Sequence, residues 1–122
     1  MGYTILIVDD DDLNREVLDA YLSLEGYSVL ITGSGHKAID ITQAKQPDLV
    51  LLDVHLPDLN GIEVCRFLKS NPTTRHIPIM IITGLSDWET RQQAKDASVD
   101  LFFPRPFDGD DFTEAVKNIL SS

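Results

Sequence analysis

The chain has 122 residues, of which 43% are hydrophobic and 25% are charged, which is the size and composition of a single globular domain. Its apolar runs are too short to span a bilayer, so we expect no membrane-embedded segment. The 20 acidic and 10 basic residues give a formal net charge of −10, which opposes direct binding to nucleic acid phosphates. We therefore predict one domain over residues 1–122 that binds neither membranes nor nucleic acid directly.

Cysteine usage and the N-terminal sequence indicate the cellular compartment. Cys65 is the only cysteine, so no disulfide can form within the chain, and a reducing environment is expected. Acidic residues directly follow the first apolar run, whereas a secretory signal begins with basic residues and stays apolar for longer. We therefore expect a cytoplasmic protein.

Five apolar runs of strand length alternate with five helical patterns along the chain. Strands are predicted at residues 3–8, 28–32, 49–52, 79–83 and 101–103. Helices are predicted at about residues 13–24, 35–44, 61–69, 87–97 and 109–120. Asp11 or Asp12 can serve as the N-cap of the first helix, and Gly26 is a suitable C-terminal stop for it.

The regular alternation of strand and helix predicts a doubly wound α/β domain with a parallel sheet. Three of the five predicted strands are continuous apolar runs, as expected where helices cover both faces of a sheet. In such sheets, ligands bind beyond the carboxyl ends of the strands, at the point where the strand order reverses. Functional residues are therefore expected where the predicted strands end.

Polar residues follow four of the predicted strands. They are Asp9 to Asp12 after the first strand, Asp53 after the third, Thr83 and Gly84 at the end of the fourth, and Arg105 after the fifth. A coenzyme phosphate would need a loop that offers backbone N–H groups, and four consecutive carboxylates would repel it. This edge of the sheet therefore favours a cation over a nucleotide or flavin.

Three of these carboxylates, from Asp9, Asp10 and Asp53, would crowd together at one edge. Like charges in contact raise at least one carboxylate pKa unless a hard cation compensates for them. Mg²⁺ suits such a site because it binds carboxylate oxygens and retains waters that a phosphate can replace. With the Thr83 hydroxyl and the Arg105 charge, these are the parts of a phosphoryl-transfer site with a carboxylate nucleophile.

The sequence resembles the receiver domains of two-component response regulators over nearly its whole length. Four segments carry the resemblance in the family's order, namely ILIVDDDDLNR, LVLLDVHLPDLNG, IITG and FFPRPF. By analogy with chemotaxis receivers, the resemblance implies a flavodoxin-like, five-stranded parallel sheet of order 2-1-3-4-5 with five helices.

The resemblance also implies roles for the residues around the acidic cluster. Asp53 would be the phosphoacceptor, and Asp10 would bind Mg²⁺ directly. Asp9 would bind the ion mainly through water, and the backbone carbonyl of His55 would complete the protein's share of the ligands. The Thr83 hydroxyl would bond the phosphoryl group.

The other matching positions supply backbone donors, an aromatic ring and a cation. The backbone N–H groups of His55 and Gly84 would assist in binding the phosphoryl group. Phe102 falls where the family has its switch aromatic, although the sequence alone does not distinguish it from the adjoining Phe103. Arg105 stands where the family has a lysine, and the peptide bond to the following proline is usually cis.

These observations predict a phosphoacceptor signalling switch. The phosphoryl donor would be a histidine kinase or phosphotransfer protein, and a downstream effector protein or domain would recognise the changed surface of the fourth helix, fifth strand and fifth helix. Such a domain promotes only its own phosphorylation and dephosphorylation, so we do not expect an enzyme acting on other substrates. Dimerisation through the fourth and fifth helices is left open.

Arg105 leaves an alternative function open. Arginine keeps the charge of lysine but spreads it over a planar fork that prefers bidentate contacts. If this fork paired permanently with Asp53, the chain would be a phosphorylation-independent docking module. An aspartyl phosphatase of the dehalogenase type is disfavoured, because its second carboxylate falls where this chain has His55. His55 and Leu85 would flank the path of hydrolytic water, and the apolar Leu85 predicts slow loss of the phosphoryl group.

Overall fold

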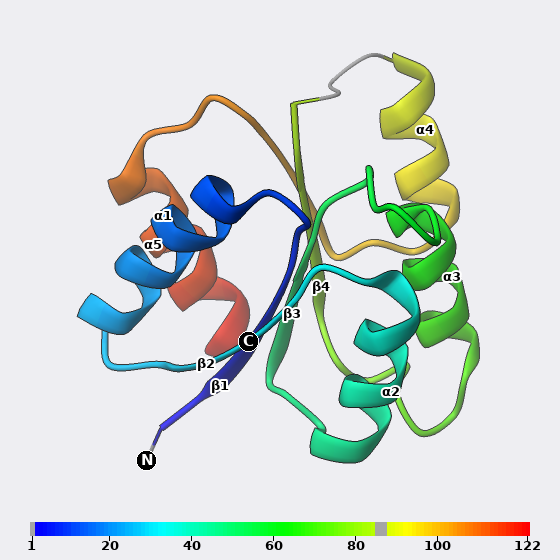
Figure 1. The fold of residues 1–122 in the computed structure, drawn as a ribbon, viewed down its shortest axis with the longest axis horizontal. Helices are drawn as coiled ribbons and strands as arrows, with labels where there is room; N and C mark the ends of the chain where they lie inside the picture. The colour runs from blue at the N-terminus through cyan, green and yellow to red at the C-terminus, as the bar shows by residue number, and fades with distance from the viewer. Residues whose placement is uncertain (1, 85–87) are drawn as a thin grey trace.

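The computed structural model describes residues 2–84 and 88–122, which form a five-stranded parallel sheet between two layers of helices (Figure 1). The strands are β1 (Thr4–Val8), β2 (Ser28–Thr32), β3 (Leu49–Leu52), β4 (Ile79–Thr83) and β5 (Leu101–Pro104). Their order in the sheet is β2-β1-β3-β4-β5. The predicted doubly wound fold and strand order are therefore confirmed.

Five helices connect and cover the strands. They are α1 (Asp12–Leu24), α2 (Gly35–Lys45), α3 (Gly61–Ser70), α4 (Trp88–Asp96) and α5 (Gly109–Leu120). Helices α1 and α5 lie on one face of the sheet, and α2, α3 and α4 lie on the other (Figure 1). Residue 87, where the sequence predicts that the fourth helix begins, lies outside the described residues.

Burial along each strand follows its place in the sheet. The two central strands β3 and β4 are buried at every residue, and β1 is buried except at its first residue. The edge strands β2 and β5 are only partly buried. Pro104 extends β5 one residue beyond its predicted end, and it is accommodated because an edge strand leaves one side of its backbone unpaired.

Alternate residues of the central strands enter two separate apolar cores. Leu6, Val50 and Ile81 pack on the side of α2, α3 and α4, while Ile7 and Phe112 pack on the side of α1 and α5. Side chains of a strand point alternately to opposite faces, so one apolar run supplies both cores. These two cores hold the carboxyl ends of β1, β3 and β4 in place next to one another.

Side chains at the helix ends match several of the predicted signals. The Asp11 carboxylate accepts a hydrogen bond from the backbone N–H of Asn14, so Asp11 is the N-cap of α1. Gly26 follows the end of α1 with a φ of 86°, a conformation that costs glycine little. Within the described parts of the chain, no helix has the length and apolarity needed to cross a membrane.

Candidate functional site

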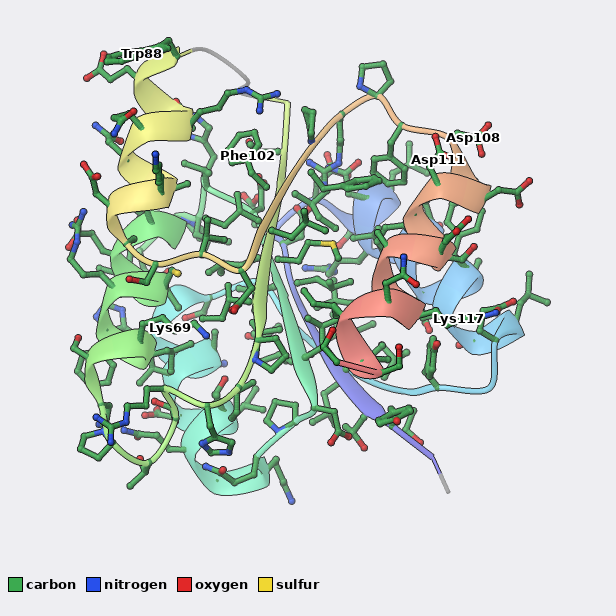
Figure 2. The ribbon with its side chains drawn as sticks, turned by 180° about the vertical axis from the view of Figure 1, so that it is seen from behind. Lys69, Trp88, Phe102, Asp108, Asp111 and Lys117 are labelled. Atoms are coloured by element: carbon green, nitrogen blue, oxygen red, sulfur yellow. The ribbon has the colours of Figure 1, made fainter. Side chains whose placement is uncertain are left out.

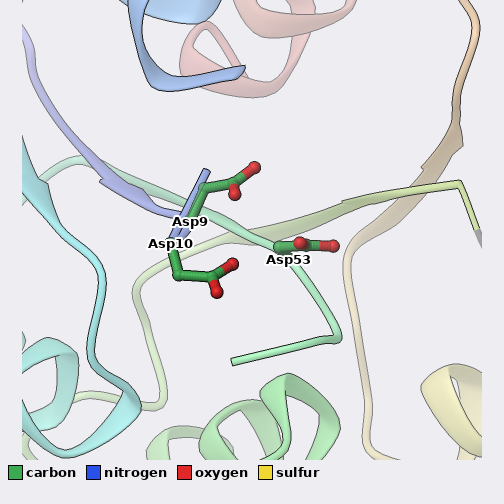
Figure 3. A group of neighbouring side chains, drawn as sticks. All are labelled: Asp9, Asp10 and Asp53. Carbon is green, nitrogen blue, oxygen red and sulfur yellow. The ribbon is translucent and has the colours of Figure 1, made fainter. Parts of the chain in front are cut away.

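Three carboxylates meet at the carboxyl ends of β1 and β3. One oxygen each from Asp9, Asp10 and Asp53 lies within 4.8 Å of the others (Figure 3). The parallel ladder produces this meeting, because Val8 pairs with Leu52 and the Asp53 N–H donates to the Val8 carbonyl at 2.9 Å. Asp9 is buried, Asp10 is exposed and Asp53 is partly buried.

Asp9 is the most enclosed of the three, with 1% of its surface exposed. Its Oδ1 accepts a hydrogen bond of 2.9 Å from the Asp11 N–H. Its Oδ2 accepts one of 2.8 Å from Nη2 of Arg105. Both carboxylate oxygens of Asp9 therefore accept a hydrogen bond from another group of the protein.

Arg105 reaches this cluster from the loop that follows β5. Its backbone N–H donates to the Thr83 carbonyl at 2.9 Å, and the peptide bond to Pro106 is cis, as the resemblance implies. The guanidinium Nη1 lies 3.9 Å from Oδ1 of Asp53, a longer contact than the 2.8 Å pair with Asp9. The arginine therefore bridges two carboxylates, and its hydrogen bond goes to Asp9 rather than to Asp53.

The surroundings of Asp53 act on its ionisation in both directions. Burial and the negative charge of Asp9 raise the pKa of Asp53. The charge of Arg105, the Val54 N–H at 2.8 Å and the Thr83 hydroxyl hydrogen bond oppose this rise. The two raising causes dominate: burial is the larger, and the like charge of Asp9, expected from the sequence, is the second, so the pKa of Asp53 is raised.

Other residues implicated by the sequence lie around Asp53. Thr83 is the last residue of β4 and is 2% exposed, and Gly84 follows it at the surface. His55 lies two residues beyond Asp53 with an exposed side chain. Leu85, expected to influence phosphoryl lifetime, lies outside the described residues. The roles assigned to these residues stay predictions.

The two adjoining aromatic residues of β5 face opposite sides of the sheet. The Phe103 ring lies 5.2 Å from that of Phe107 and 6.1 Å from that of Phe112, measured between ring centroids, in the core under α1 and α5. Phe102 faces α4, where the Arg91 guanidinium carbon lies 4.7 Å from its ring centroid (Figure 2). Phe102 is therefore the aromatic of this pair that lies against α4, whereas Phe103 belongs to the core under α1 and α5.

Asp58 is a further structural residue near the site, and sequence reasoning did not identify it. Its carboxylate accepts hydrogen bonds from the Ser34 hydroxyl at 2.7 Å and from the N–H groups of Gly35 and His36 at 2.8 and 3.1 Å. It also contacts Nδ1 of His36 at 2.7 Å. Asp58 thus fastens the segment after Asp53 to the first turn of α2. An aspartate in a turn is a known capping signal, but its target here is distant in sequence.

The donor set fits a hard divalent cation. Carboxylate oxygens are the preferred protein ligands of Mg²⁺, which binds through one or two of them and retains several waters. The exposed Asp10 and the partly buried Asp53 offer such oxygens at the surface end of the cluster. Three carboxylates against one arginine leave the cluster with excess negative charge, which favours a cation there.

Comparisons with known proteins identify the family of the chain. The family model described as response regulator receiver domain matches residues 5–117. The chain is 38% identical over 120 residues to the response regulator MprA of Mycolicibacterium vanbaalenii, covering 98% of this chain and 51% of that protein. It is 29% identical over 120 residues to the polar-differentiation response regulator DivK of Brucella ovis, covering 98% of both. The chain thus spans about half the length of MprA and nearly all of DivK.

Solved structures show the same fold. A response regulator from Chloroflexus aurantiacus superimposes with a TM-score of 0.95 at 32% identity, covering 100% of both chains. The receiver domain of the sensor histidine kinase PA1611 from Pseudomonas aeruginosa gives a TM-score of 0.92 at 25% identity and full coverage of both chains, and it has a magnesium ion in its active site cleft. From its sequence match and its fold, the chain belongs to the response regulator receiver domain family.

Proposed function

We propose that this receiver domain accepts a phosphoryl group on Asp53 from a phosphohistidine of a histidine kinase or phosphotransfer protein. The observation that carries the proposal is the meeting of Asp9, Asp10 and Asp53 within 4.8 Å, with Arg105 alongside. A cation bound to these carboxylates, for which Mg²⁺ is the natural choice, would supply positive charge to the incoming phosphoryl group. We place this reaction in the cytoplasm.

In the proposed reaction, a carboxylate oxygen of Asp53 attacks the phosphorus of the donor. The P–N bond to the donor imidazole breaks, its electron pair returns to the nitrogen, and an acyl phosphate forms on Asp53. The nucleophile must be ionised, which the Val54 N–H, the Thr83 hydroxyl and Arg105 favour against burial and the charge of Asp9. Arg105 can then contact the transferred group, since Nη1 already lies 3.9 Å from Asp53.

The proposed output begins at the ends of β4 and β5. Thr83 is the last residue of β4 and lies beside Asp53. Phe102 lies on the neighbouring strand β5, where it pairs with Ile81 of β4. A phosphoryl group adds charge and acceptor oxygens, so the Thr83 hydroxyl would turn toward it and Phe102 would move into the space released. An effector protein or domain that prefers the resulting surface of α4, β5 and α5 shifts the population toward that form.

The arginine contacts also bear on the alternative function, a phosphorylation-independent docking module. That function requires an arginine that permanently blocks Asp53. Here the hydrogen bond of Arg105 goes to Asp9, while the Asp53 contact is the longer one. The geometry therefore favours the phosphoacceptor over the docking module.

The test is incubation with acetyl phosphate and Mg²⁺, followed by intact-mass measurement. We expect one added phosphoryl group on the wild-type protein, none on Asp53→Asn, and none when EDTA removes the divalent cation. Asp40 is exposed on α2, so Asp40→Asn is the matched control and should be phosphorylated like the wild type. A folded wild-type protein that binds Mg²⁺ but never gains the adduct would contradict the proposal in favour of docking.

A further inference from the structure

The contacts of Asp9 indicate that the Arg105 guanidinium compensates the negative charge of this buried carboxylate. Asp9 is almost completely buried, and an ionised carboxylate in such a place needs donors or a cation. One oxygen takes the Asp11 N–H, and the other takes the Arg105 guanidinium. The Arg105 side chain is itself only 20% exposed, so water screens this pair less than a surface pair.

A second arginine lies close to Asp9 but does not contact its carboxylate. Nη1 of Arg15 donates to the backbone carbonyl of Asp9 at 3.0 Å. Its other terminal nitrogen pairs with the exposed carboxylate of Asp12. Arg15 therefore supplies a positive charge at Asp9 without occupying the oxygens that a divalent cation would approach.

We propose that Arg105 is an internal counter-ion that competes with the divalent cation for Asp9, so that cation binding releases the guanidinium for the phosphoryl group on Asp53. This inference rests on the metal site of the proposed function. Two cations repel each other when they share one buried carboxylate, so cation binding must weaken the Arg105–Asp9 bond. The released fork remains beside Asp53, because its Nη1 already lies 3.9 Å from that carboxylate.

This competition gives Arg105 two successive partners. Without the cation it stabilises the buried Asp9, and with the cation it is available to a planar, multidentate contact with phosphoryl oxygens. A bound cation would then both complete the phosphoryl-transfer site and determine whether Arg105 contacts Asp9 or the phosphoryl oxygens. The arrangement uses the fork of arginine, whose two terminal nitrogens lie toward different carboxylates.

The first test is Mg²⁺ titration of the full chain by isothermal calorimetry. Arg105→Gln removes the competing cation and should tighten Mg²⁺ binding about five- to tenfold. Arg15→Gln removes an equal charge near Asp9 without freeing its carboxylate, and should change the affinity by less than about twofold. Arg105→Lys, which keeps the charge and loses the fork, should fall between the wild type and Arg105→Gln, and it replaces the glutamine variant if that variant is not folded by circular dichroism.

The second test observes Arg105 directly by NMR of ¹⁵N-labelled arginine side chains, with the signal assigned from its absence in Arg105→Lys. Saturating Mg²⁺ should accelerate rotation and water exchange of the Arg105 guanidinium, while the Arg15 signal stays as it was. Equal Mg²⁺ affinities of the wild type and Arg105→Gln, or an unchanged Arg105 signal at saturation, would overturn the competition and leave the proposed function standing. No Mg²⁺ binding by either protein would instead remove the metal site and the proposed function with it.

Discussion

Gly61 lies directly against the main-chain carbonyl of Asp53. A Cβ atom at position 61 would come within 1.9 Å of the Asp53 carbonyl oxygen and 2.8 Å of its carbon. The Gly61 N–H also donates to the Val54 carbonyl at 2.8 Å. The first residue of α3 therefore determines where the chain passes after Asp53, and with it the position of the carboxylate.

From this contact we expect Gly61→Ala to disturb the site and the fold together. The added methyl group must displace backbone rather than a flexible side chain, and overpacking of this kind costs about 1–3 kcal/mol of unfolding free energy. Urea denaturation should show this loss, and phosphorylation by acetyl phosphate should slow. Gly84→Ala is the control for stability, because a Cβ there meets no atom within 4 Å among the residues that the structure describes. An alanine variant at 61 with wild-type stability would show that the backbone yields easily.

Asp53 should make the metal-free protein less stable at neutral pH. Burial and the charge of Asp9 raise the pKa of Asp53, so its contribution favours folding below the pKa of the unfolded chain and is lost as the pH rises through the folded-state value. We expect Asp53→Asn to raise the melting temperature by a few degrees at pH 7 without Mg²⁺. This gain should disappear below about pH 4, where the carboxyl is protonated in both states. A gain that is the same at both pH values would have another origin.

The secondary structure was predictable because each strand is a short apolar run bounded by a turn or charged residue. The predicted bounds of β2, β3 and β4 agree with the structure, and the other two strands differ by one residue. The approach of Asp9 and Asp53 also followed, since parallel strands end at one edge. Periodicity and topology carry this information without any knowledge of side-chain contacts.

The contacts of Arg105 and Asp58 could not be predicted in the same way. Arg105 could have paired with Asp53, and its hydrogen bond to Asp9 depends on the path of the loop after β5. Asp58 binds groups 22 to 24 residues earlier in the chain, and no local spacing identifies such a target. The orientation of the Phe102 side chain toward α4 depends on the register of β5 in the sheet. Each of these relations depends on long-range geometry.

Asp58 should stabilise the protein through its charge. Hydrogen bonds from the Ser34 hydroxyl, from the Gly35 and His36 N–H groups and from the His36 ring hold the pKa of Asp58 well below its usual range. A depressed pKa stabilises the fold above the pKa of the unfolded chain, and this stability is lost as the pH falls through the folded-state value.

Asp58 is exposed, so water screens these bonds, and we expect Asp58→Asn to lower the melting temperature by only a few degrees at pH 7, and by less as the pH falls below about 4. Asp40→Asn removes an equal charge from the exposed side of α2 and should leave the melting temperature nearly unchanged. Thermal unfolding of the three proteins across this pH range measures the effect. Equal decreases in melting temperature for Asp58→Asn and Asp40→Asn would show that the effect comes from net charge rather than from the hydrogen bonds of Asp58 to α2.

Arg91 should hold Phe102 in the position that it has before phosphorylation. The guanidinium carbon lies 4.7 Å from the ring centroid, within the range of a cation–π contact worth about 0.5–2 kcal/mol. Figure 2 shows Phe102 beside α4, with Trp88 at the first turn of this helix. If Phe102 is the moving aromatic, the contact with Arg91 must break when the ring moves.

Arg91→Gln should therefore increase the fraction of Phe102 rings in the moved position before any phosphoryl group is added. The measurement is NMR of labelled phenylalanine rings with and without acetyl phosphate and Mg²⁺, where the variant should start closer to the phosphorylated spectrum and change less. Arg91→Lys keeps a cation and should lie nearer the wild type, and Arg66→Gln removes an equal charge from the exposed side of α3. A Phe102 signal that is unaffected by both phosphorylation and Arg91→Gln would show that Phe102 is a static core residue, because a moving ring must respond to at least one of them.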